Sequence, residues 1–257
     1  MILTVDIGNS RIKYAVWQTD RIIDRGVAAY VKNNSSESFD ELFSAIGPLS
    51  EERPSRVLAV CVAGDDVSQA LQTWVNWHWQ LDVEYLKTEK QYQNIINAYQ
   101  DPAQHGVDRW AGIVAGHLSF PGCSVCVVGA GTAVTFDLIK ADGQHLGGFI
   151  LPSYATMHAA LMADTAKVES TYSVQFHQHG IPDNTDDAVN QGLHRFLRAG
   201  VRDLCQFALD TMGEPMKIII TGGFAKTILD YPDMPVMQHE PDLVMQGLYE
   251  IMIQQKD

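Results

Sequence analysis

The chain has 257 residues, of which 46% are hydrophobic and 19% charged, a balance typical of a folded globular protein with a sizeable core. Its formal net charge of -13 argues against a protein that binds nucleic acid through a broad basic surface. The apolar stretch at the N-terminus is too short for a signal peptide, and no segment has the roughly 18 apolar residues that span a bilayer. We therefore expect a cytoplasmic protein without a nucleic-acid or membrane partner.

The first part of the chain reads as three strands followed by alternating helices and strands. Strands are expected over 2–6, 11–17, 21–30, 56–62 and 83–86 because β-branched and other apolar residues are enriched there. Amphipathic spacing predicts helices over 37–46 and 65–77.

The same plan then recurs. A helix is expected over 108–120, strands over 124–128, 133–139, 144–151 and 217–220, and helices over 154–163, 185–212 and 242–254. A three-stranded meander with a glycine turn thus occurs twice, from residue 1 and from residue 124. This duplication predicts an α/β protein of two like domains, residues 1–107 and 108–257, that close on a nucleotide.

The turn that follows the first strand allows two interpretations. Asp6-Ile7-Gly8-Asn9-Ser10 is compatible with an ordinary hairpin, because Gly-Asn is a favoured turn pair. It is also compatible with a phosphate-binding turn, in which backbone N–H groups hold an anion and a carboxylate holds its magnesium. The similar turn at Gly129-Ala130-Gly131-Thr132 favours the second interpretation.

Gly106-Val107-Asp108-Arg109 is the candidate reactive segment. Phosphoryl transfer to an alcohol requires positioning, charge stabilisation and a carboxylate that accepts the hydroxyl proton. Asp108 is therefore the candidate general base, and the planar donors of Arg109 would orient the acceptor. The alternative is an exposed Asp-Arg pair at a helix start, where aspartate commonly caps. The two flanking phosphate turns favour the catalytic interpretation.

These stretches together resemble type III pantothenate kinases of the actin-like, sugar kinase and Hsp70 ATPase superfamily. The family's first phosphate motif, D-x-G-N-[ST]-x-x-K-x-A, is similar to Asp6-Ile7-Gly8-Asn9-Ser10-Arg11-Ile12-Lys13-Tyr14-Ala15, with the lysine one place early. Its G-x-D-R motif stands at Gly106–Arg109, with Tyr99 and Pro102 before it. Its second phosphate motif is matched by Gly131-Thr132-Ala133-Val134-Thr135-Phe136-Asp137.

The resemblance implies two ribonuclease H-like (actin-like ATPase) domains, each a mixed sheet flanked by helices, with the active site in the cleft between them. It implies ATP-dependent phosphorylation of pantothenate to 4′-phosphopantothenate, the first step of coenzyme A biosynthesis, by a homodimer. The implied ATP-binding residues are Asp6, which would also hold Mg²⁺, Ile7, Gly8, Asn9, Ser10, Arg11, Ile12, Lys13 and Thr132. The implied pantothenate-binding residues are Tyr99, Gly106, Val107, Asp108, Arg109 and Thr185, the last reaching pantothenate across the dimer interface.

One position departs from the family pattern. The aspartate that opens the second phosphate motif, and that binds a monovalent cation such as K⁺ or NH₄⁺, is Gly129 here. We therefore expect either weaker dependence on potassium or an ion held by backbone carbonyls and water. Two other functions are considered: a transcriptional accessory factor without kinase activity, and another small-alcohol kinase of the superfamily.

Overall fold

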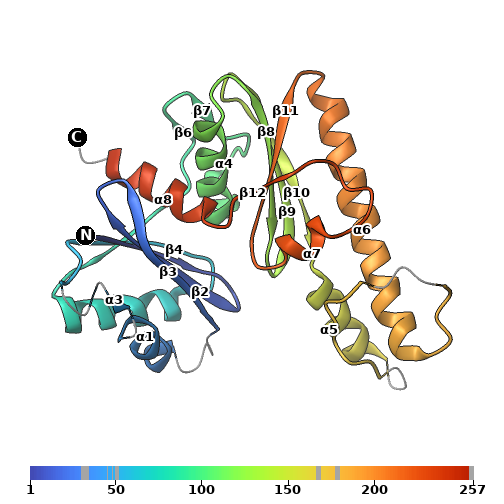
Figure 1. Ribbon diagram of the computed structural model, residues 1–257. Coiled ribbons are helices and arrows are strands. Elements are labelled where there is room, and N and C mark those ends of the chain that lie inside the picture. The colour runs from blue at the N-terminus through green and yellow to red at the C-terminus, as the bar shows by residue number, and fades with distance from the viewer. Residues whose placement is uncertain are drawn as a thin grey trace. The chain divides into compact units, whose positions relative to one another are not determined.

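The computed structural model describes residues 1–29, 35–44, 46–47, 49, 52–165, 169–176 and 180–254 (Figure 1). The chain divides into two compact units, each made of separate segments. Unit 1 comprises Met1–Gln93, Tyr99–Ala115 and Asp242–Asp257, and unit 2 comprises Asn94–Ala98 and Gly116–Pro241. This division differs from the single boundary expected after residue 107, because one helix contributes to both units and the last helix returns to unit 1.

Unit 1 is built on a mixed five-stranded sheet. Its strands are β1 (Ile2–Ile7), β2 (Arg11–Gln18), β3 (Arg21–Ala29), β4 (Arg56–Cys61) and β5 (Val83–Tyr85), in the order β3-β2-β1-β4-β5. Figure 1 shows α1 (Ser35–Ser44) and α3 (Asp65–Trp79) on one face of this sheet and α8 (Leu243–Gln254) on the other. Both faces of β1 and β4 are buried, and this burial fixes the carboxyl ends of these strands in a rigid layer.

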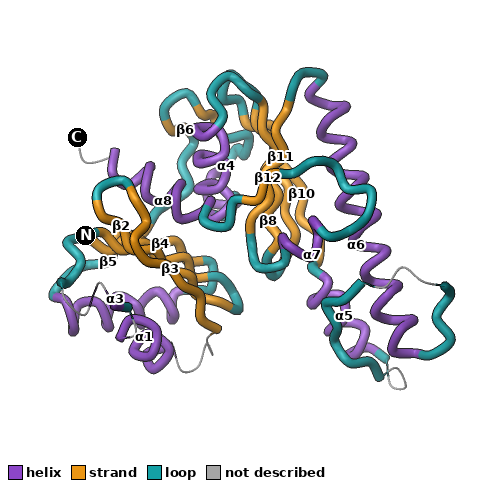
Figure 2. Tube along the Cα trace, in the orientation of Figure 1, coloured by secondary structure: helices purple, strands orange, loops and turns teal. Residues whose placement is uncertain are grey.

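Unit 2 repeats this strand plan. Its strands are β8 (Ser124–Ala130), β9 (Ala133–Ile139), β10 (His145–Pro152), β11 (Met216–Thr221) and β12 (Gln238–His239), in the order β10-β9-β8-β11-β12. The helices that follow in the chain are α5 (Tyr154–Asp164), α6 (Thr185–Met212) and α7 (Ala225–Leu229). The long helix α6 buries its apolar stripe against β8 and β11. The two glycine turns therefore hold equivalent places, each between the first two strands of a sheet. Figure 2 shows the strands of both sheets in orange and the connecting segments in teal.

The remaining elements connect these layers. Helix α4 (Val107–Ser119) follows the short strands β6 (Gln91–Tyr92) and β7 (Ile95–Ile96) and a 3₁₀ turn at Pro102–Gln104. The expected α/β class, with two mixed sheets flanked by helices, is confirmed. Cys61, Cys123, Cys126 and Cys205 are free thiols. Among the described residues, no helix has the length and apolar character needed to cross a membrane.

Candidate active site

The first glycine turn is a tight connection between two antiparallel strands. Asp6 pairs with Lys13 across the ladder, and the Gly8 N–H donates to the Arg11 carbonyl at 3.0 Å. The hairpin interpretation is therefore correct as a description of the backbone. It is also compatible with ligand binding, because Asn9, Ser10 and Arg11 at the tip are exposed and Asp6 lies at the end of a buried strand.

Asp6 carries an energetically costly charge. Its side chain is almost completely buried, and this burial raises the pKa of the carboxyl from 3.8 to about 6. The Lys13 ammonium, 3.9 Å from the carboxylate, lowers the pKa, while the negative charge of Asp108 raises it. Unit 1 therefore brings Asp6 and Asp108 within electrostatic range of each other. Two neighbouring carboxylates of this kind favour the binding of a cation, which could also contact a ligand.

The G-x-D-R segment forms the first turn of α4. The Trp110 N–H donates to the Gly106 carbonyl at 3.0 Å, and a Cβ atom at Gly106 would lie only 2.9 Å from Asp108 Oδ1. That oxygen accepts the Arg109 N–H at 2.8 Å. The pair thus lies at a helix start, as the alternative interpretation expects, but it is not exposed, because Arg109 is almost buried. This placement does not conflict with a catalytic role, since Asp108 remains half-exposed and has a second carboxylate oxygen.

Arg109 is held in place by Tyr99. The guanidinium is almost buried, donates to the Tyr99 hydroxyl at 3.2 Å and lies 5.9 Å from the centre of that ring. Tyr99 in turn stacks on His105, with ring centres 4.6 Å apart. The sequence interpretation did not assign His105. Its place directly before G-x-D-R was the only signal, and a lone histidine does not distinguish stacking from core packing.

Unit 2 presents its own glycine turn. Thr132 is exposed, and its carbonyl accepts the Thr156 hydroxyl of α5 at 2.9 Å. The turn at Gly222 packs directly on the end of β8: Gly222 has a φ of 102°, and a Cβ atom there would lie 2.4 Å from the Ala130 carbonyl oxygen. The turn at Gly222 therefore meets the turn at Gly131 at the carboxyl end of β8, where the Phe224 N–H donates to the Ala130 carbonyl at 3.0 Å.

Gly129, which stands where the family pattern has an aspartate, has little space beside it for a side chain. A Cβ atom at Gly129 would lie 2.6 Å from Thr135 Oγ1, which is opposite it on β9. The threonine hydroxyl thus occupies the space in which a side chain at residue 129 would begin. Asp137 does not replace the missing carboxylate, because it is buried further along β9 and bonds to His145.

Thr185 is the first residue of α6 and is exposed. The Asn184 side chain caps this helix by accepting the Asp187 N–H at 2.9 Å. Of the predicted residues, those of the first turn, Tyr99 and the G-x-D-R segment belong to unit 1, whereas Thr132 and Thr185 belong to unit 2.

Two mixed sheets of the same strand order, each with a glycine turn between its first two strands, define an actin-like ATPase fold. Two crystal structures are similar over nearly the full chain: a Campylobacter jejuni protein assigned to the Baf family of transcriptional activators (TM-score 0.60, 20% identity, 99% and 98% of the two chains) and a Sinorhizobium meliloti protein assigned as a 2-dehydro-3-deoxygalactonokinase (TM-score 0.58, 11% identity, 99% and 96%). At these identities the likeness shows the fold alone.

The sequence comparisons define the family more closely. Residues 2–206 match the family model described as type III pantothenate kinase. Relatives named type III pantothenate kinase include proteins from Nitrosococcus oceani, 35% identical over 98% of this chain and 93% of the relative, and from Acinetobacter baumannii, 30% identical over 96% of each. The chain belongs to the type III pantothenate kinase family.

Proposed function

We propose that this chain phosphorylates pantothenate with ATP to give 4′-phosphopantothenate, the first step of coenzyme A biosynthesis. Membership of the type III pantothenate kinase family carries the activity. The observation that supports it within the chain is the grouping in unit 1 of two interacting carboxylates, Asp6 and Asp108, with an arginine held by Tyr99. An enzyme site that transfers a phosphoryl group to an alcohol needs a cation site, a base and a positively charged group that orients the alcohol.

In this proposal Asp108 accepts the proton of the pantothenate hydroxyl as the oxygen attacks phosphorus. Its Oδ1 is engaged by the Arg109 N–H, so Oδ2 is the basic oxygen. The Arg109 guanidinium and the Tyr99 hydroxyl orient polar groups of pantothenate, with the Gly106–Val107 backbone beside them. Positioning of this kind supplies most of the catalysis in phosphoryl transfer.

Asp6 would hold Mg²⁺ with the phosphates of ATP. The site fits a cation, because a divalent ion would stabilise the ionised carboxylate of Asp6, which burial and the charge of Asp108 disfavour. Bound Mg²⁺ would neutralise charge on the phosphates. The exposed tip of the first turn and the Lys13 ammonium of unit 1, and Thr132 of unit 2, would contact the nucleotide.

A coupled assay of ADP release with ATP, Mg²⁺ and pantothenate tests the activity and the base together. We expect pantothenate-dependent turnover by the wild type, a loss of about 10²–10⁴-fold in Asp108→Asn, and an unchanged rate in Glu52→Gln, which removes an exposed carboxylate of unit 1. An inactive wild type would refute the function. Full activity of Asp108→Asn would refute only the assignment of the base.

For the monovalent cation, we propose weaker dependence on K⁺ than a carboxylate at residue 129 would give. Turnover should be similar in potassium, ammonium and sodium buffers. The double variant Gly129→Asp, Thr135→Ala makes room for the carboxylate and should gain potassium stimulation, whereas Thr135→Ala alone should not. Strong potassium dependence of the wild type would contradict the proposal and favour an ion held by backbone carbonyls and water.

We further propose a homodimer formed along β10. This edge strand exposes Phe149 and Ile150, and Phe149 packs edge-on against the exposed Phe207 of α6 at 5.7 Å. Exposed apolar side chains on an unpaired edge strand are typical of an interface. Thr185 would reach the pantothenate of the second copy. Ile150→Lys should give a monomer in sedimentation experiments, and a dimer of unchanged affinity would refute this surface.

The other two functions have less support. A transcriptional accessory factor needs neither Asp6 nor Asp108, and the net charge of -13 opposes contact with nucleic acid. Another small-alcohol kinase would not require Tyr99 before G-x-D-R. Because ATP and coenzyme A precursors are metabolites of the cytoplasm, we place the enzyme there, without a membrane partner.

A further inference from the structure

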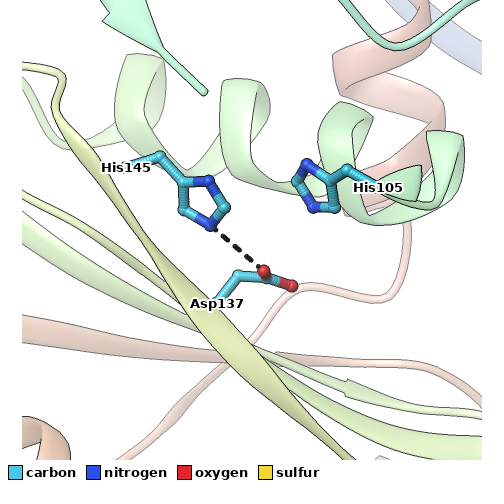
Figure 3. Close-up of side chains that lie close together, drawn as sticks. All are labelled: His105, Asp137 and His145. Carbon is cyan, nitrogen blue, oxygen red and sulfur yellow. Dashed lines mark hydrogen bonds and ion pairs between the residues drawn. The ribbon is translucent and has the colours of Figure 1, made fainter. Parts of the chain in front are cut away.

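A buried polar pair in unit 2 has no part in the roles given above. Asp137 on β9 and His145 at the start of β10 are 1% and 0% exposed. Figure 3 shows their hydrogen bond, in which His145 Nε2 lies 3.2 Å from Asp137 Oδ1. A carboxylate and an imidazole buried to this extent are costly unless both are hydrogen-bonded, so the partners of each group matter for the fold.

The second nitrogen of His145 bonds to the backbone of a segment 47 residues earlier. The Ala98 N–H donates to His145 Nδ1, with 3.3 Å between the nitrogens. An imidazole that accepts at Nδ1 carries its proton on Nε2, which donates to Asp137. The carboxylate therefore selects the one neutral tautomer of His145 that can accept from Ala98.

The segment that contains Ala98 is bound to unit 2 along its length. The Ile96 N–H donates to the Gly143 carbonyl at 2.9 Å, and Asn94 Nδ2 donates to the Asp142 carbonyl at 3.2 Å. The His145–Ala98 hydrogen bond is the last of these attachments before the chain continues into Tyr99. The tautomer of His145 thus acts on the peptide that joins unit 2 to the tyrosine that holds Arg109.

We propose that Asp137 and His145 are positioning residues for the pantothenate pocket, acting through the Ala98–Tyr99 peptide. Asp137 fixes the tautomer and ring orientation of His145, and His145 fixes the Ala98 amide. This fixes the backbone from which Tyr99 presents its hydroxyl to Arg109. The inference rests on the proposed function for its effect on pantothenate, whereas the fixation of the Ala98 amide is independent of it.

Two measurements on His145→Phe and Asp137→Ala test the proposal. His145→Phe keeps an aromatic ring but removes both hydrogen bonds, and Asp137→Ala removes the group that selects the tautomer. Loss of one such bond should accelerate hydrogen exchange of the Ala98 amide by about tenfold. It should also raise the KM for pantothenate by about tenfold, with kcat and the KM for ATP within about twofold of wild type.

Two further variants separate positioning from general loosening. Asp137→Asn retains an oxygen that accepts the His145 Nε2–H, so it should restore wild-type exchange and KM. Val201→Ala leaves a cavity in the buried face of α6, in the same unit but in a core cluster that does not include Ala98, and should leave the KM for pantothenate unchanged.

Wild-type exchange at Ala98 in both His145→Phe and Asp137→Ala would overturn the proposal, as would an equal rise of the pantothenate KM in Val201→Ala. A wild type that turns over no pantothenate would refute the proposed function instead. In that case the exchange rates alone would still decide whether the Asp137–His145 pair fixes the Ala98 amide.

Discussion

Replacement of Asp6 by asparagine should make the unliganded protein more stable while it abolishes activity. Burial and the charge of Asp108 raise the pKa of Asp6 from 3.8 to about 6. A difference of about two pKa units at about 1.36 kcal/mol each means that the ionised carboxylate lowers the free energy of unfolding at neutral pH by up to roughly 3 kcal/mol. Asparagine keeps the shape of the side chain without the charge.

The pH dependence gives the sign of this effect. Because the folded-state pKa is raised, the folded protein binds this proton more tightly than the unfolded chain does. Its stability from this group is therefore fully present below the ordinary carboxyl pKa and is lost as the pH rises through about 6. Asp6→Asn should gain up to roughly 3 kcal/mol at about pH 7.5 and little at about pH 4.

Urea unfolding of wild type, Asp6→Asn and the exposed-site control Glu52→Gln, without nucleotide or metal, measures this difference. Addition of Mg²⁺ and ATP should then stabilise the wild type but not Asp6→Asn, because the variant lacks the proposed metal ligand. If Asp6→Asn is no more stable than wild type at about pH 7.5, or is equally more stable at both pH values, the reasoning from burial is wrong.

Three further predictions concern Tyr99, Arg56 and Gly222. Tyr99→Phe removes the hydroxyl that accepts from Arg109, so the KM for pantothenate should rise about fivefold to tenfold in steady-state assays while the KM for ATP stays constant; equal changes in both would contradict the role of Tyr99. Arg56→Met leaves the half-buried Glu84 without its two 2.7 Å hydrogen bonds and should cost about 1–2 kcal/mol in urea unfolding, a loss that Glu84→Gln in the same background should reduce. Gly222→Ala should cost at least about 2 kcal/mol and weaken ATP binding measured by calorimetry, because the added Cβ would strike the Ala130 carbonyl; unchanged stability would contradict the described turn.

Local residue patterns were sufficient to predict most of the longer strands and the fold class of this protein. The runs of apolar residues that form β1, β2, β8 and β9 have short-range signals, and the glycine turns interrupt them at defined positions. The two-residue strands β6, β7 and β12 were missed, because so short a strand has no periodicity to detect. The α/β class and the duplicated plan thus follow from the order of patterns along the chain.

The sequence by itself determined the family, the two glycine turns and the candidate residues Asp6, Asp108 and Arg109, because motif spacing is a local property. Only the tertiary structure decided which of them interact. It shows that Asp6 is buried and interacts with the negative charge of Asp108, and that Thr135 fills the space beside Gly129. It also pairs Asp137 with His145. Burial and the pairing of strands are long-range properties, and they set the pKa values and the hydrogen bonds that motifs cannot specify.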